Sequence, residues 1–165
     1  MIERHLDIAS ADGAMNSFVV QPEEGGPFPV VLFYMDAPGK REELHDMARR
    51  IAAVGYFVVL PNLYYRRSRD YYLKERTEAG MAEMFGHMNA LSIAMNLRDT
   101  RALIDFVDAQ PEADARRIGA VGYCMSGPFS SGYTTNEFIA PSGVGMSMCF
   151  SIIGTLCSSW RVVPR

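Results

Sequence analysis

The sequence predicts an α/β fold with a mostly parallel sheet that carries helices on both faces. Apolar runs of strand length at 28–34, 56–60 and 118–121 are separated by segments of helical periodicity, which is typical of parallel strands joined by crossover helices. Segments 2–9 and 14–21 instead alternate between apolar and polar residues, and an Ala-Asp-Gly turn joins them. They predict an antiparallel hairpin at the N-terminal end of the sheet.

Length and composition limit the kinds of protein that this chain can be. With 165 residues, 48% of them hydrophobic, and a net charge of −3, we expect a single domain over 1–165 and no nucleic acid or membrane partner. We see no apolar run near the ~20 residues that span a bilayer and no secretory signal. Three cysteines are too few for a disulfide framework, so a cytoplasmic location is expected. The spacing of Cys and His predicts no metal, and no cofactor is expected.

The first α/β unit can be followed residue by residue. The strand at 28–34 is apolar throughout, as expected for a strand buried on both faces. A helix follows, ended by Gly55, because apolar residues recur at spacings of three and four: Leu44, Met47, Ile51 and Val54. The next strand, 56–60, is closed by Pro61. Strand, helix and strand within so short a span predict a right-handed parallel crossover.

The segment 62–80 is aromatic and basic, and two interpretations are open. It can be a solvated loop that leads into a helix, which we favour. Alternatively it forms a wall that holds an anionic substrate, with Tyr64, Arg66 and Arg76 as binding residues, because arginine pairs well with carboxylates.

Two further segments have helical spacing. Residues 81–88 are apolar at Met81, Met84, Phe85 and Met88, which favours core packing. The segment 93–107 predicts a clear helix that ends at Gln110-Pro111, with an apolar face of Ile93, Leu97, Thr100, Ile104 and Val107.

The segment that follows the strand at 118–121 is the most informative of the chain. Its sequence, GYCMSG, places small residues on both sides of Cys124, as a sharp turn from a strand into a helix requires. Such a turn exposes the residue at its apex and aims backbone amides at a developing oxyanion. We therefore interpret it as a nucleophile elbow with cysteine at the apex. The alternatives are that Cys124 is a small buried hydrophobe or that Ser126 is the nucleophile, although its flanks do not fit elbow spacing.

Three blocks together resemble the dienelactone hydrolase family of cysteine-dependent α/β hydrolases. They are 33–39 (FYMDAPG), 55–64 (GYFVVLPNLY) and 121–129 (VGYCMSGPF), and the resemblance covers residues 3–129. It implies an α/β-hydrolase-like sheet. It also implies carboxymethylenebutenolidase-like hydrolysis of a small ester or lactone, typically a cyclic enol-lactone, through an acyl-enzyme.

The resemblance also implies roles for single residues. Cys124 would be the nucleophile, and the backbone amides of Met125 and Ala37 would form the oxyanion hole. Asp36 stands where the family has an acidic residue near the thiol. An equally weighted alternative is that Asp36 caps the helix that follows it.

The tail at 130–165 departs from the family and is expected to be truncated or altered, with one or two strands over 144–156. The family places its acid and its histidine after the nucleophile, but no Asp and no His follows Cys124 here. We expect His45 to be solvated and His87 to lie in the core, and we assign neither as the base.

This missing base leaves other hypotheses open. The chain can be a catalytically impaired scaffold or a small-acid-binding protein, or a thiol redox sensor. A second copy can also supply the base in a homodimer.

Overall fold

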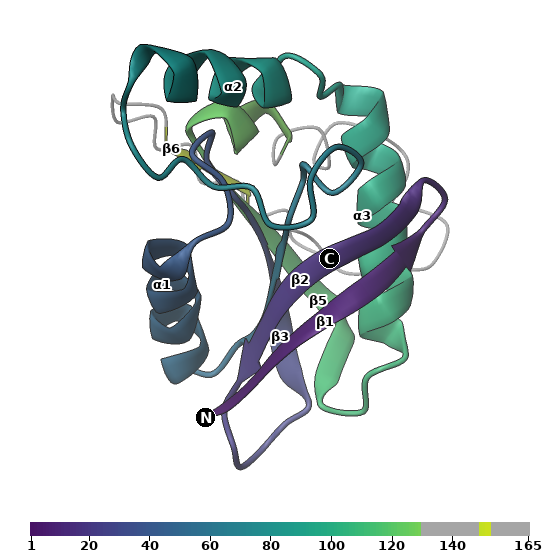
Figure 1. Ribbon diagram of the computed structural model, residues 1–165. Coiled ribbons are helices and arrows are strands. Elements are labelled where there is room, and N and C mark those ends of the chain that lie inside the picture. Colours follow the sequence, from purple (N-terminus) through teal and green to yellow (C-terminus); the bar gives the residue numbers. More distant parts are fainter. Residues whose placement is uncertain (130–148, 153–165) are drawn as a thin grey trace.

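The computed structural model describes residues 1–129 and the backbone of residues 149–152. These residues form a six-stranded sheet and three α-helices, shown in Figure 1. In chain order the elements are β1 (Ile2–Ser10), β2 (Gly13–Gln21), β3 (Phe28–Tyr34), α1 (Glu42–Ala53), β4 (Phe57–Pro61), α2 (Glu78–Met88), α3 (Ile93–Asp108), β5 (Ala113–Tyr123), the short 3₁₀ turn η1 (Cys124–Ser126) and β6 (Cys149–Ile152).

The strand order β1-β2-β4-β3-β5-β6 confirms the predicted fold class. Strands β1 and β2 form the expected hairpin, and β2 pairs antiparallel with β4. The other pairs are parallel: β3 lies between β4 and β5, and β6 adds to β5. The carboxyl ends of β3, β4 and β5 therefore meet at one edge of the sheet, which is where open α/β sheets build their sites.

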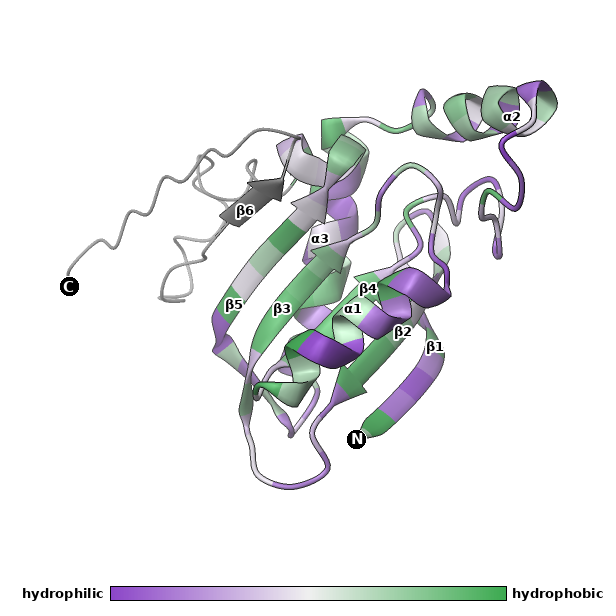
Figure 2. Ribbon diagram, turned by 90° about the vertical axis from the view of Figure 1, so that its left-hand side faces the viewer, coloured by the Kyte–Doolittle hydropathy of each residue, from purple (hydrophilic) through white to green (hydrophobic). Residues whose placement is uncertain are grey.

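Helices cover both faces of the sheet. Helix α1 lies on one face and α3 on the other, while α2 lies beyond the edge where β3, β4 and β5 end (Figures 1 and 2). The central strands are the most apolar part of the sheet, as Figure 2 shows. Their buried side chains form the core together with residues of the helices, among them Phe18, Phe33, Phe57, Leu60 and Leu103. None of the helices in the described part of the chain has the length and apolarity to cross a bilayer.

Three apolar residues expected to pack are exposed instead. Helix α1 ends one residue before Val54, whose side chain is 74% exposed, because Gly55 with φ +99° turns the chain away. Ile93 is the first residue of α3 and Phe85 lies on the outer side of α2, and both are exposed. Periodicity predicted these two helices, but it did not predict which of their apolar residues contact the sheet.

Strand β5 is longer than the predicted 118–121. It begins at Ala113, with a shift in its register against β3 between Pro29 and Val30. The early part of β5 was missed because it is charged rather than apolar. Asp114 is buried there and pairs with the side chains of Arg116 and Arg117.

Two histidines are buried against aromatic rings. The expectation that His45 is solvated is wrong: it lies on the face of α1 that packs on β2, with its ring 4.4 Å from that of Phe18. His87 is buried as expected, with its ring 4.1 Å from that of Tyr71. Burial lowers the pKa of His45 and that of His87 below the ordinary value, because water no longer stabilises the charged imidazole.

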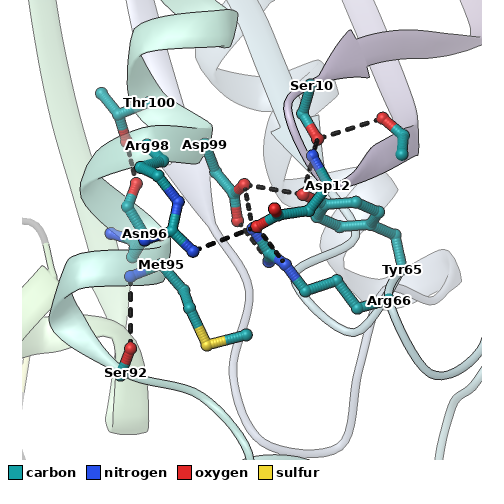
Figure 3. Close-up of polar contacts among 11 residues, drawn as sticks. Ser10, Asp12, Tyr65, Arg66, Ser92, Met95, Asn96, Arg98, Asp99 and Thr100 are labelled. Atoms are coloured by element: carbon teal, nitrogen blue, oxygen red, sulfur yellow. Dashed lines mark hydrogen bonds and ion pairs between the residues drawn. The ribbon is translucent and has the colours of Figure 1, made fainter.

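A buried ion-pair network ties the hairpin tip to α3 and to the loop after β4 (Figure 3). Asp99 of α3 is almost completely buried and accepts hydrogen bonds from the Arg66 guanidinium, at 2.6 and 2.8 Å, and from the Tyr65 hydroxyl, at 2.8 Å. Arg66 also donates to Asp12 in the hairpin turn, at 2.6 Å. The Tyr65 hydroxyl is 2.6 Å from that of Ser10. This network fixes the loop that carries residue 64.

We expect Asp99→Ala to destabilise the fold by about 3–5 kcal/mol, because it leaves the partly buried Arg66 without its main partner. Asp46→Ala is the matched control. It removes an exposed pair with Arg49 on α1, and such pairs contribute at most about 1 kcal/mol. Urea denaturation measures both, and equal losses in the two variants would contradict the assignment.

The buried histidines predict a loss of stability at mildly acidic pH. A histidine whose pKa is lowered on folding binds fewer protons in the folded state, so its contribution is present above the unfolded value, near 6.5, and is lost as pH falls below it. We expect the melting temperature to fall as pH falls through that value toward the onset of carboxylate titration. The double variant His45→Gln, His87→Gln should show a smaller fall, and a wild-type curve that is flat over this window would refute the explanation.

Candidate active site

The candidate site is built around Cys124, which directly follows β5. Its φ is +54°, and it is the only non-glycine residue with positive φ in the described part of the chain. Such a conformation costs about 1–3 kcal/mol and clusters at functional sites. The thiol is free and the residue is exposed. The predicted sharp turn is therefore confirmed, and the alternative of a buried, hydrophobe-like Cys124 is wrong.

Ser126 ties this turn to the neighbouring strand. Its side chain is fully buried, and its hydroxyl donates a hydrogen bond to the carbonyl of Met35, which directly follows β3. The adjacent strands are already in register here, with Tyr34 opposite Gly122. Ser126 is thus a structural link between the turn and the loop after β3. Its burial and its engaged hydroxyl argue against the alternative that it is the nucleophile.

The loop after β3 is held in a fixed shape beside the turn. The Pro38 carbonyl accepts from the Leu73 amide at 2.8 Å. Gly39 has φ +95°, and a Cβ atom there would lie 2.6 Å from the carbonyl oxygen of Tyr71, so only glycine fits. Ala37 lies in this loop and is buried. Within the residues that the structure describes, its amide donates to no other group, as an oxyanion-hole donor requires.

Asp36 has a partner that the sequence analysis did not predict. Its two carboxylate oxygens accept hydrogen bonds from the Arg41 guanidinium at 2.6 and 3.0 Å, a bidentate ion pair. This hydrogen bonding raises the pKa of Arg41 above its ordinary value. The expectation that Asp36 caps α1 is wrong, because Arg41 is the residue at that N-cap. The spacing of five residues across a Pro-Gly turn is the one sequence feature that could have indicated the pair.

Tyr64, predicted as a substrate-binding residue, lies at the site. It is buried, and its hydroxyl is 2.8 Å from the carbonyl oxygen of Ala37 and 3.4 Å from the sulfur of Met125. Burial raises the pKa of the Tyr64 phenol well above its ordinary value, and negative charge on Asp36 or Cys124 acts in the same direction. The hydroxyl is therefore protonated at neutral pH and acts as a donor.

The two predicted binding arginines are placed differently. Arg66 has its charge satisfied by Asp12 and Asp99 in the buried network, so the structure gives it a structural role in place of the predicted contact with substrate. Arg76 is exposed on the segment that leads into α2, and its predicted role stays a prediction. Among the described contacts of the three predicted wall residues, those with Ala37 and Met125 are made by Tyr64.

The described residues supply no base in contact with the thiol. Ring nitrogens of His45 and His87 lie 3.1 and 3.9 Å from the carboxylates of Glu42 and Glu83, respectively. In this part of the chain, no group of His, Cys, Asp and Glu side chains could hold a metal ion. No Asp and no His follows Cys124 in the sequence. The tail at 130–165, which the sequence analysis expected to be truncated or altered, lies outside the described residues apart from β6. Strand β6 falls within the range 144–156, where one or two strands were expected.

A cavity of about 450 Å³ lies beside the first turn of α1. It is lined by charged and aromatic side chains, among them Lys40, Arg41, Arg69, Tyr71 and Tyr72. Cys124 does not line it. Two of its lining residues contact the candidate site: Arg41 pairs with Asp36, and the ring of Tyr71 lies 5.7 Å from that of Tyr64.

Comparisons with known proteins agree with this fold. A crystal structure of a provisionally named dienelactone hydrolase from Klebsiella pneumoniae superimposes with a TM-score of 0.67 at 22% identity, over 78% of this chain and 53% of that one. A dienelactone hydrolase from Anabaena variabilis superimposes with a TM-score of 0.55 at 14% identity, over 78% and 55%. At these identities the likeness establishes the fold.

Proteins similar in sequence also include carboxymethylenebutenolidases. A Methylorubrum extorquens protein provisionally named carboxymethylenebutenolidase is 28% identical over 144 residues, which are 87% of this chain and 48% of the relative. A carboxymethylenebutenolidase of Pseudomonas putida is 24% identical over 127 residues, 77% of this chain and 53% of the relative. This chain thus spans about half the length of these relatives. The profile of the dienelactone hydrolase family matches residues 15–140, most of the chain. The chain belongs to the dienelactone hydrolase family.

Proposed function

We propose that this chain carries the nucleophile and the oxyanion hole of a cysteine-dependent hydrolase that acts on an ester or a lactone. The observation that carries the proposal is the exposed thiol of Cys124, held in a left-handed conformation where β5 ends. Family membership supports it, since related proteins are named for hydrolysis of a lactone. Because Arg66 is already paired, the substrate is proposed no further than a small ester or lactone.

The reaction would proceed in two steps. The Cys124 thiolate attacks the carbonyl carbon, and the negative charge that develops on the carbonyl oxygen is stabilised by the amides of Ala37 and Met125. The tetrahedral intermediate then expels the alcohol or enol oxygen and leaves an acyl thioester on the sulfur. Water attacks the thioester and releases the acid, which regenerates the thiol.

The rate that this chain can reach depends on its base. Loss of the base from a catalytic triad costs about 10⁴- to 10⁶-fold, whereas binding and an oxyanion hole alone retain about 10³- to 10⁴-fold over water. No described histidine hydrogen-bonds to the thiol. We therefore propose that activated esters acylate Cys124, but only slowly. The same observation favours a second candidate function, a non-catalytic scaffold that binds a small acid.

Hydrolysis of p-nitrophenyl acetate separates the two functions. We expect release of p-nitrophenolate above the buffer rate, and a return to that rate in Cys124→Ala, because the attacking sulfur is gone. Cys149→Ala is the matched control and should keep the wild-type rate. A wild-type rate equal to that of Cys124→Ala would favour the scaffold.

Alkylation tests the thiol without any need for turnover. We expect iodoacetamide to modify Cys124 much faster than Cys149 or Cys157, because its thiol is free and exposed at the sharp turn after β5. Mass spectrometry of the digested protein measures all three rates in one experiment. Equally slow labelling of the three cysteines would speak against an activated thiol.

A further inference from the structure

We infer that Tyr64 is a positioning residue for the oxyanion hole, because its single hydroxyl contacts both residues whose amides would form that hole. This inference rests on the proposed function and adds to it a residue that acts through others. The Tyr64 hydroxyl lies 2.8 Å from the carbonyl oxygen of Ala37 and 3.4 Å from the sulfur of Met125. Ala37 belongs to the loop after β3 and Met125 to the turn after β5. Tyr64 follows β4, so the three loops converge on one atom.

The hydroxyl has one proton, and the two contacts are therefore not equivalent. An oxygen at 2.8 Å is a better acceptor than a thioether sulfur at 3.4 Å, so the proton is donated to the Ala37 carbonyl. The contact with Met125 is then a packing contact between oxygen and sulfur. One bond fixes the Ala37–Pro38 peptide unit, which directly follows the unit that carries the Ala37 amide, and the other contact limits how far the Met125 side chain can move from it.

The ring of Tyr64 has little freedom to turn away from these partners. Its ring centroid lies 5.1 Å from that of His87 and 5.7 Å from that of Tyr71, and the centroids of those two rings lie 4.1 Å apart with their planes tilted by 40°. The residue is 1% exposed, so no solvent-filled space competes for the hydroxyl. His87 and Tyr71 thus form the back wall that aims the hydroxyl at Ala37 and Met125.

The backbone of Tyr64 is fixed as well. Its amide donates to the side-chain oxygen of Asn62 at 2.9 Å, and the side-chain nitrogen of Asn62 donates to the carbonyls of Ser68 and Arg69. The two residues that follow Tyr64 are held by Asp99 in the network of Figure 3. The loop after β4 is therefore anchored at several points, as a support for an oxyanion hole must be.

Such support matters because the two donors come from separate segments. An oxyanion hole accelerates a reaction only if its donors are held in place before the charge develops, and a displacement of about 1 Å can cost about 10²-fold. Ser126 links the same two segments beneath the turn through the Met35 carbonyl. Tyr64 provides a second link, through the Ala37 carbonyl and the Met125 side chain.

The test compares acylation of the thiol with its alkylation. Acylation by p-nitrophenyl acetate passes through an oxyanion: the sulfur bonds to the acetyl carbon, p-nitrophenolate leaves and the thiol proton goes to water. Alkylation by iodoacetamide displaces iodide at a saturated carbon and forms no oxyanion. In Tyr64→Phe we expect the rate of Cys124 acetylation to fall about 10- to 100-fold, with the alkylation rate and the circular dichroism spectrum unchanged.

Tyr56→Phe is the matched control, since it removes an exposed tyrosine hydroxyl just before β4 that takes no part in these contacts, and it should acetylate at the wild-type rate. Met125→Leu removes the sulfur but keeps the hydroxyl–carbonyl bond, and its acetylation rate should fall less than that of Tyr64→Phe.

If Tyr64→Phe does not fold, an unchanged acetylation rate in Met125→Leu overturns the inference. In folded Tyr64→Phe, equal falls in acetylation and alkylation, or no fall in acetylation, also overturn it. Wild-type protein that is not acetylated at Cys124 contradicts the proposed function together with this inference.

Discussion

The candidate site depends on one backbone constraint, the left-handed conformation of Cys124 at the end of β5. A side-chain-bearing residue does not adopt this conformation without support, because its Cβ atom crowds its own backbone. Parallel pairing of β5 with β3 holds the strand before the turn, and the buried Ser126 holds the turn after it. The consequence is a thiol that projects from the edge of the sheet instead of packing inside it.

The loops after β3, β4 and β5 are joined to one another by side chains rather than by a shared strand. Ser126 reaches the Met35 carbonyl, Tyr64 reaches the Ala37 carbonyl, and Arg41 holds the Asp36 carboxylate. The first two bonds join different loops at the carboxyl edge of the sheet, and the third joins two residues of the loop after β3. Two of these three contacts are thus hydrogen bonds to backbone carbonyls.

The sequence predicted well what depends on local pattern. The hairpin, the β3–α1–β4 crossover and the sharp turn at Cys124 follow from alternation, helical spacing and small residues around one thiol. Long-range partners were not predictable in the same way. The pair between Asp36 and Arg41 and the burial of His45 against Phe18 arise only when separate elements meet.

Arg66 shows the same limit of prediction from sequence. The sequence presented Arg66 as a free cation in a basic segment, because its two carboxylate partners lie 54 and 33 residues away. Folding brings both of them to its guanidinium, and a residue predicted to bind substrate becomes part of the scaffold. Tyr64, predicted from the same segment, reaches the site because it directly follows β4 at the carboxyl edge.

The most direct test of this account is a crystal structure of the protein after reaction with p-nitrophenyl acetate. The account predicts an acetyl group on the sulfur of Cys124, with its carbonyl oxygen roughly 2.7–3.1 Å from the backbone nitrogens of Ala37 and Met125. An acetyl oxygen that points into solvent, away from both nitrogens, would contradict it.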